Sequence, residues 1–349
     1  MEQHIHGGDI YHYQDVIDFS SNCNPLGTPL GVREAIIKSA DNIKHYPDVQ
    51  CRELRCALEA YEGIPSTQII CGNGAADLIF TLALAGKPKR ALLPVPTFAE
   101  YEKALKSVSC TITYYKIEEK NGFLIRNEIL KQINDELDIL FLCNPNNPTG
   151  LLCPDDLLIE ILKACHKHQV LFVLDECFID FLDRSGTHTM KSYLQDFKQL
   201  FILKAFTKRY AMAGLRLGYG LSSDTSLLDK MHQVTQPWNV SAPAQMAGIA
   251  ALGENQYVEA ARVLIRQERA YIKQALAQQG LYVYDSLANY VFFCGPKDLK
   301  ERCLKEGILI RDCSNYYGLS KGYYRVAVRT HQENEKLLEA IDNSLSWRM

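Results

Sequence analysis

The stretch Leu200-Phe201-Ile202-Leu203-Lys204-Ala205-Phe206-Thr207-Lys208-Arg209 is the most informative part of this sequence. Its apolar half predicts a buried strand, and Lys208 lies just past the strand end, where α/β sheets bind ligands. Arg216 follows eight residues later. A lysine that forms a Schiff base needs a partly desolvated amine, and a nearby guanidinium can clamp a phosphate. Lys204 is the competing lysine, but it has no arginine eight residues later.

The surrounding sequence predicts an α/β fold with a mostly parallel central sheet. Between about residues 65 and 225, short apolar runs alternate with amphipathic stretches, as in βα units. The predicted strands cover residues 68–71, 90–93, 111–117, 138–143, 170–174, 199–203 and 216–221. Helices are predicted at 75–85, 99–107 and 154–168.

A smaller α+β domain is predicted after this sheet. A helical pattern at about 255–279 leads to strand-like runs at 281–284, 290–294, 308–311 and 323–328, and a closing helix begins near residue 333. We therefore expect an N-terminal arm at 1–30, a large cofactor-binding domain at 31–264 and a small domain at 265–349. In this interpretation the first residues of the large domain can pack on the small domain.

Composition favours an enzyme that acts on a small molecule in the cytoplasm. The chain has 349 residues, 47% of them hydrophobic, enough for two cores. A net charge of -3 gives no basic field for nucleic acid or an anionic membrane. The sequence has no apolar run of membrane-spanning length and no signal-peptide pattern at its start. The twelve cysteines lack metal-ligand spacing, so neither a disulfide nor a metal is expected.

Two strand ends carry polar groups of chemical interest. Asp175 closes the apolar run 170–174, where a carboxylate needs a cationic partner. A protonated pyridine nitrogen is one such partner, and a helix cap or an arginine pair are the alternatives. Asn147 lies in Asn144-Pro145-Asn146-Asn147-Pro148-Thr149-Gly150, where its amide can donate to a phenolic oxygen.

The segment Cys71-Gly72-Asn73-Gly74-Ala75-Ala76-Asp77 joins a predicted strand to a predicted helix. Its small residues let backbone N–H groups approach a phosphate at the helix start. A third glycine is missing, so the segment does not establish a dinucleotide site.

These segments, in this order, resemble fold-type I pyridoxal-phosphate enzymes of the aminotransferase class I/II group, with the aspartate aminotransferase fold. The resemblance covers almost the whole chain. It implies pyridoxal 5'-phosphate as the cofactor, with Lys208 as the Schiff-base lysine, Asp175 on the pyridine nitrogen and Asn147 on the O3' oxygen. The other cofactor contacts that it implies are Gly74, Ala75, Ala76 and Arg216 at the phosphate, Phe98 stacked on the ring, and Thr207 beside the lysine.

The resemblance also implies a homodimer. Tyr46, in His45-Tyr46-Pro47-Asp48, is similar to the tyrosine that reaches the phosphate of the neighbouring subunit, and the N-terminal arm is a candidate to reach that site too. Two positions depart from the common pattern. Phe178 stands where many aminotransferases have a tyrosine, and Ala205 stands where a serine or threonine usually contacts the phosphate.

The N-terminal motif narrows the resemblance to one branch. His6-Gly7-Gly8-Asp9, followed by Asp18-Phe19-Ser20-Ser21-Asn22-Cys23-Asn24-Pro25-Leu26-Gly27, is very similar to the threonine-phosphate decarboxylases of cobalamin synthesis. Asp9 replaces their asparagine. The implied substrate is a small phosphorylated amino acid, bound by His6, Asn22, Asn147, Arg311 and Arg325, with Arg325 on its carboxylate and Arg311 and His6 on its phosphate.

The sequence thus predicts decarboxylation of L-threonine O-3-phosphate to (R)-1-amino-2-propanol O-2-phosphate. Transamination of histidinol phosphate or a related amino acid is the main alternative, because it uses nearly the same residues. Serine phosphate differs by one methyl group, which is worth only about 1 to 3 kcal/mol of discrimination. A regulator that binds the cofactor and DNA is a further alternative, disfavoured by the near-neutral charge.

Overall fold

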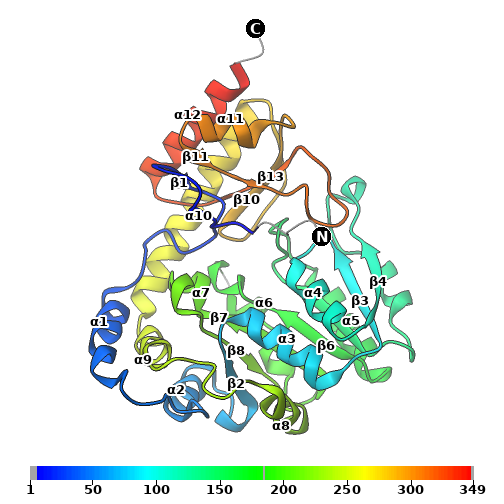
Figure 1. Ribbon diagram of the computed structural model, residues 1–349. Coiled ribbons are helices and arrows are strands. Elements are labelled where there is room, and N and C mark those ends of the chain that lie inside the picture. The colour runs from blue at the N-terminus through cyan, green and yellow to red at the C-terminus, as the bar shows by residue number, and fades with distance from the viewer. Residues whose placement is uncertain (1–5, 184, 347–349) are drawn as a thin grey trace.

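A computed structural model describes residues 6–183 and 185–346, and its centre is a seven-stranded sheet (Figure 1). The strand order is β2-β8-β7-β6-β5-β3-β4, and every neighbouring pair is parallel except those that involve β8. The strands are β2 (Ile69–Gly72), β3 (Arg90–Val95), β4 (Thr111–Lys116), β5 (Ile139–Cys143), β6 (Leu171–Asp175), β7 (Leu200–Ala205) and β8 (Gly218–Leu221). The predicted α/β fold and its seven strands are confirmed, with ends shifted by one or two residues.

Helices cover both faces of this sheet, because alternate residues of the buried strands point to opposite sides. One core contains Phe141, Val173 and Leu203 together with α3 (Ala75–Gly86), α4 (Ala99–Ser107) and α8 (Thr225–Val234). The opposite core contains Leu142 and Leu174 with α2 (Arg52–Glu62), α5 (Asp155–Lys167) and α9 (Ala242–Ala251). Helix α1 (Leu30–Ser39) packs on α9.

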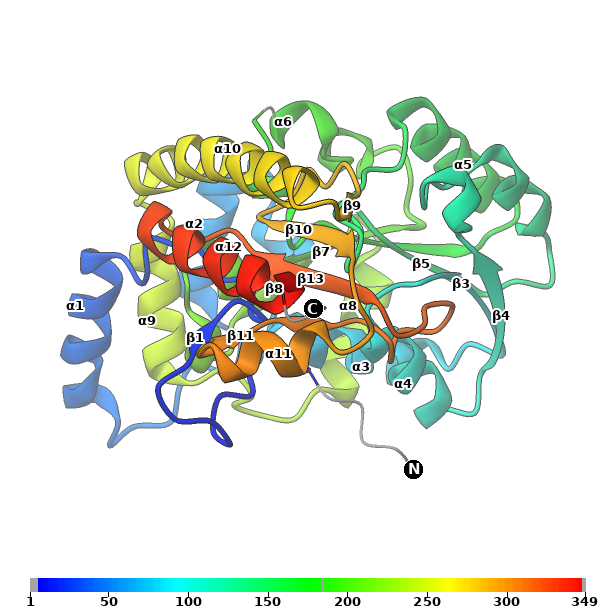
Figure 2. The same cartoon turned by 90° about the horizontal axis from the view of Figure 1, so that it is seen from above.

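A second, antiparallel sheet has the order β12-β13-β10-β9. The long helix α10 (Asn255–Gln278) runs from the first sheet to this one and lies beside α12 (His331–Ser346), as Figure 2 shows. The remaining elements are β9 (Tyr282–Val283), β10 (Tyr290–Cys294), β12 (Arg311–Asp312), β13 (Tyr323–Ala327), α11 (Leu299–Lys305), α6 (Ser185–His188) and α7 (Phe206–Arg209). The predicted boundary at 264/265 falls inside α10, and the division into domains stays a prediction.

The predicted strand at 308–311 is wrong as a single element. Strand β11 (Ile308–Leu309) pairs in parallel with β1 (Ile17–Asp18), whereas Arg311 and Asp312 pair with β13. The chain changes sheets at residue 310, so the N-terminal segment is fixed beside the second sheet. In the described part of the chain, no helix is both long and apolar enough to cross a membrane.

Successive residues at the ends of β6 and β7 face opposite sides of the first sheet. Asp175 and Ala205 line a cavity above the sheet, whereas Glu176 and Lys204 are buried below it. Lys204 Nζ lies 3.6 Å from Glu176, 3.9 Å from Glu62 and 3.9 Å from Asp180. These three carboxylates raise the pKa of Lys204, although burial alone would lower it. Lys204 therefore belongs to a buried ion cluster and not to the cavity.

We expect Lys204→Met to lower the free energy of unfolding by about 3 kcal/mol at neutral pH, because it leaves the buried carboxylate of Glu176 without a cation. Glu62 and Asp180 keep their ion pairs with Lys191 and Arg209. The loss should shrink as the pH falls, since protonated carboxyl groups do not need the ammonium. Denaturant titration of the cofactor-free protein measures this. Lys198→Met, at an exposed position next to the same strand, is the matched control. Equal stability of the two variants at neutral pH would contradict the ion-cluster interpretation.

Candidate functional site

A cavity of about 520 Å³ opens above the carboxyl ends of β5, β6 and β7. The start of α3, the first turn of α4, the N-terminal segment and the second sheet complete its walls. Twelve of the predicted site residues line it: His6, Asn22, Ala75, Ala76, Phe98, Asn147, Asp175, Thr207, Lys208, Arg216, Arg311 and Arg325. Two predicted residues are not part of the lining. Gly74 is the residue before Ala75 in the sequence, and Tyr46 is exposed on the surface outside the cavity.

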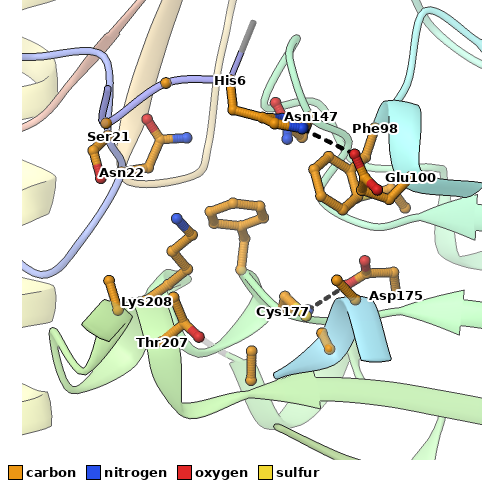
Figure 3. Close-up of a pocket in the computed structure, with 18 of the residues that line it drawn as sticks. His6, Ser21, Asn22, Phe98, Glu100, Asn147, Asp175, Cys177, Thr207 and Lys208 are labelled. Atoms are coloured by element: carbon orange, nitrogen blue, oxygen red, sulfur yellow. Dashed lines mark hydrogen bonds and ion pairs between the residues drawn. The ribbon is translucent and has the colours of Figure 1, made fainter. Parts of the chain in front are cut away.

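Lys208 extends from α7 into the cavity, with Thr207 beside it (Figure 3). Among the described residues, none forms a hydrogen bond or an ion pair with its amine. The turn that carries Lys208 is held by Asn24, which lies near the N-terminus. Its backbone N–H donates to Lys208 O at 3.0 Å, and its Nδ2 donates to Arg209 O at 2.9 Å. The Asn-Pro-Leu-Gly motif therefore fixes the backbone of the lysine.

Asp175 lies at the floor of the cavity and is buried. Its oxygens accept hydrogen bonds from Tyr101 Oη at 2.5 Å and from Cys177 N–H at 2.9 Å. Burial raises its pKa, although these hydrogen bonds act in the opposite direction. No lysine or arginine of the described chain forms a salt bridge with it, so the arginine-pair alternative is wrong. Asp175 is a buried carboxylate that faces the cavity and lacks a cation.

The start of α3 lies against the guanidinium of Arg216. Gly74 has φ = +85°, and a Cβ there would lie 2.5 Å from Arg216 Nη2. A Cβ on Gly218 would lie 2.6 Å from Ala75 N. Both glycines thus let β8 and the guanidinium approach the helix N-terminus, where backbone N–H groups attract anions. The residues predicted to bind a phosphate therefore lie next to one another, and their role stays a prediction.

Asn147 connects the two sheets across the cavity. Its Oδ1 accepts hydrogen bonds from Arg325 Nη1 and, at 3.2 Å, from Tyr316 Oη. Because the carbonyl side of the amide is occupied, the NH₂ group is the part left for a ligand. Sequence reasoning missed Tyr316, since the loop before β13 carries no motif and only the fold brings it to Asn147.

Arg311 and Arg325 occupy directly opposed positions on β12 and β13. Both are buried and both line the cavity. Arg311 Nη2 donates to Asn315 Oδ1 at 2.9 Å, and Arg325 Nη2 donates to Ser20 O at 2.8 Å. Like charges opposite each other in a sheet are unfavourable without a counter-ion. This pair therefore favours an anionic ligand.

The N-terminal segment closes one side of the cavity. Asn22 is buried, and its Oδ1 has no hydrogen-bond partner among the described residues. His6 Nε2 lies 2.9 Å from Glu100 Oε1. Glu100 and Lys103 also line the cavity, and sequence reasoning missed both. Their spacing on α4 is typical of ordinary surface ion pairs, so nothing in the sequence distinguished them.

The aromatic positions differ in their surroundings. Phe98 lies at the cavity wall, edge to face with Tyr101 at 5.6 Å. Phe178 is edge to face with Tyr290 at 5.1 Å and carries no hydroxyl toward the cavity. Tyr46 is exposed outside the cavity and stacks on Trp238 at 4.7 Å. No group of three potential metal-ligating side chains occurs within residues 6–183 and 185–346.

Comparisons with known proteins agree with this geometry. The family model of aminotransferase class I and II matches residues 14–341. Threonine-phosphate decarboxylase from Salmonella typhimurium is 40% identical over 98% of this chain and 96% of its own. The crystal structure of histidinol-phosphate aminotransferase from Clostridium acetobutylicum has a TM-score of 0.88 at 30% identity, covering 94% of this chain and 98% of that one.

A second solved structure, L-threonine-O-3-phosphate decarboxylase from Porphyromonas gingivalis, has a TM-score of 0.82 at 25% identity and covers 94% of this chain and 99% of that one. The similarity to threonine-phosphate decarboxylases that the motifs indicated is thereby confirmed. This chain belongs to the aminotransferase class I and II family and has the aspartate aminotransferase-like fold that its sequence predicted.

Proposed function

We propose that this chain is a pyridoxal-phosphate-dependent decarboxylase that converts L-threonine O-3-phosphate into (R)-1-amino-2-propanol O-2-phosphate for cobalamin synthesis in the cytoplasm. The observation that carries the proposal is the opposed pair Arg311 and Arg325 in the same cavity as Lys208. It provides for two anionic groups on one ligand. The 40% identity to a threonine-phosphate decarboxylase supports the choice of reaction.

The cavity residues fit pyridoxal phosphate. Arg216 and the start of α3 would hold its phosphate, Phe98 would cover its ring, and Lys208 offers a free amine for its aldehyde. Asp175 is a buried carboxylate without a cation, which suits a protonated ring nitrogen. When bound, the cofactor supplies an electron-accepting ring that takes the electron pair of the bond broken at the substrate Cα.

The protein's task is to choose which bond at Cα breaks. The orientation in which the protein holds the substrate would decide between decarboxylation and transamination. Arg325, held by Asn147 and Ser20, would bind the carboxylate, and Arg311 and His6 would bind the phosphate. Binding energy from the distant phosphate would then serve to hold the carboxylate in the orientation in which its bond to Cα breaks.

The proposed reaction exchanges one group at the substrate Cα for a proton. The Cα–carboxylate bond breaks, carbon dioxide leaves, and one proton adds to Cα in its place. We propose that Lys208 delivers that proton, because its amine extends into the cavity and no described residue binds it. The amine phosphate that results keeps its amino group, whereas a transaminase would transfer that group to an oxo acid.

We also propose a homodimer. Large apolar side chains are exposed on α1, on the segment after it, at the end of α8 and in the loop before α9: Leu30, Ile37, Ile43, Tyr46, Val49, Val234 and Trp238. A second copy of the chain would cover this surface, since apolar patches of this kind mark interfaces. Tyr46 lies on it, consistent with a role at the neighbouring subunit's site.

The reaction is tested by incubating the yellow holoenzyme separately with threonine phosphate, with serine phosphate, and with histidinol phosphate plus 2-oxoglutarate. We expect carbon dioxide from threonine phosphate, less from serine phosphate, and none from Lys208→Ala, in which borohydride should no longer fix the cofactor to the chain. Glutamate formed from 2-oxoglutarate would instead establish a transaminase. A holoenzyme that turns over none of these but shifts operator DNA in a gel would establish a regulator.

Phe178→Tyr should lower the pH midpoint of the holoenzyme's visible absorbance change. The added phenol would donate to the cofactor's O3' oxygen and so reduce the basicity of the linked nitrogen. Spectrophotometric pH titration of both proteins measures this. Phe181→Tyr, a buried phenylalanine that does not line the cavity, is the control. An unchanged midpoint in Phe178→Tyr would contradict the assigned position of Phe178.

Ile43→Asp should convert the dimer into a monomer of 39.5 kDa and weaken cofactor binding, because it places a charge in the proposed interface. Analytical ultracentrifugation gives the mass. Tyr282→Asp, an equally exposed apolar position on β9, should leave the dimer intact. A monomeric wild-type holoenzyme would rule out the proposal.

A further inference from the structure

Three polar groups, His6, Glu100 and Lys103, meet at one wall of the cavity. Figure 3 shows the pair of His6 and Glu100. Glu100 Oε1 lies 2.9 Å from His6 Nε2 and 2.7 Å from Lys103 Nζ, and these two nitrogens are 3.4 Å apart. One carboxylate oxygen thus lies between two donors. The hydrogen bond with His6 is the main reason why the pKa of Glu100 falls to about 2, and Lys103 adds to the effect.

This arrangement differs from the other ion pair on the same helix. Lys106 and Glu102 also pair within α4, but neither lines the cavity. Lys103 does line it, on the same wall as His6, and its ammonium has room to rotate because its side chain is 43% exposed. Two nitrogens that share one carboxylate oxygen can equally share a phosphate oxygen, which carries more charge.

Charge also favours a phosphate at this wall. At neutral pH a phosphate monoester carries close to two negative charges. Lys208 and Arg216 are assigned to the cofactor and Arg325 to the substrate carboxylate, which leaves Arg311 as the one arginine assigned to the phosphate, together with the His6 imidazole. A second cation is needed to balance it, and Lys103 is the remaining lysine or arginine that lines the cavity.

We propose that Lys103 binds the substrate's phosphate and determines specificity for phosphorylated amino acids, and that Glu100 is a positioning residue that keeps Lys103 and His6 together. This assignment rests on the proposed function. In the free enzyme Glu100 stands in for the phosphate between the two donors. When substrate binds, a phosphate oxygen joins the same donors, and Glu100 keeps them from turning into solvent.

Lys103→Met should raise the KM for threonine phosphate at least about tenfold, the usual loss for one charge-assisted hydrogen bond, with kcat changed by less than about threefold. Lys103→Arg should retain most of the affinity. Lys106→Met is the matched control on the same helix and should behave as wild type. Equal KM values for Lys103→Met and Lys106→Met would overturn the assignment.

Glu100→Gln tests the positioning role. It should raise the KM severalfold in the wild-type background and by a smaller factor in Lys103→Met, where His6 is the one donor left for Glu100 to position. A lower KM in Glu100→Gln would show that the carboxylate competes with the phosphate, and would overturn the positioning role. Additive effects of the two substitutions would overturn it as well.

Binding measurements separate this inference from the proposed reaction. Calorimetric titration of the holoenzyme with 1-amino-2-propanol phosphate and with 1-amino-2-propanol gives the contribution of the phosphate without turnover. That contribution should fall at least about tenfold in Lys103→Met and stay unchanged in Lys106→Met. Failure to release carbon dioxide would refute the reaction alone, whereas an unchanged phosphate contribution in Lys103→Met would refute the role of Lys103.

Discussion

A charge at the end of a buried strand needs a partner, and this constraint organises the centre of the protein. Lys204 on β7 and Glu176, just past the end of β6, pair below the sheet. Glu62 and Asp180 join this cluster together with their own cations, Lys191 and Arg209. Asp175, one residue before Glu176, turns to the other side and has no cation among the described residues. The protein thus stabilises one set of strand-end charges and leaves the neighbouring carboxylate to a ligand.

Most of the fold was predictable because the strands of the first sheet are short apolar runs bounded by turns. Strand β10 and helix α4 have the ends that their patterns predicted. The prediction of a single strand at 308–311 was wrong for a physical reason. The apolar residues continue without a break, whereas the chain passes from one sheet to another at residue 310. Pairing with β1, nearly 300 residues earlier, has no local signal.

Site residues that belong to a sequence motif could be predicted. Residues that reach the cavity only because the chain folds as it does could not be predicted. Lys208, Asp175 and Asn147 follow apolar strands and stand out in the sequence. Tyr316 and Glu100 do not, because a tyrosine in a loop and an acid in a first helical turn are common. The contact of Asn24 with the lysine turn spans 185 positions. Its motif was recognised by resemblance, and its mechanical role became visible only in three dimensions.

The choice between two reactions depends on how firmly the far end of the substrate is held. The roles proposed for Lys208, Asp175 and Asn147 are the same in either reaction, so these residues would not decide between the two. Arg325 is fixed by Asn147 and the backbone of Ser20, and its strand partner is Arg311. A substrate gripped by both arginines has little rotational freedom about its Cα. In the proposed reaction the N-terminal segment would add to the same binding, because Ser20 holds Arg325 and His6 lines the cavity. The start of the chain would then take part in selecting the bond that breaks.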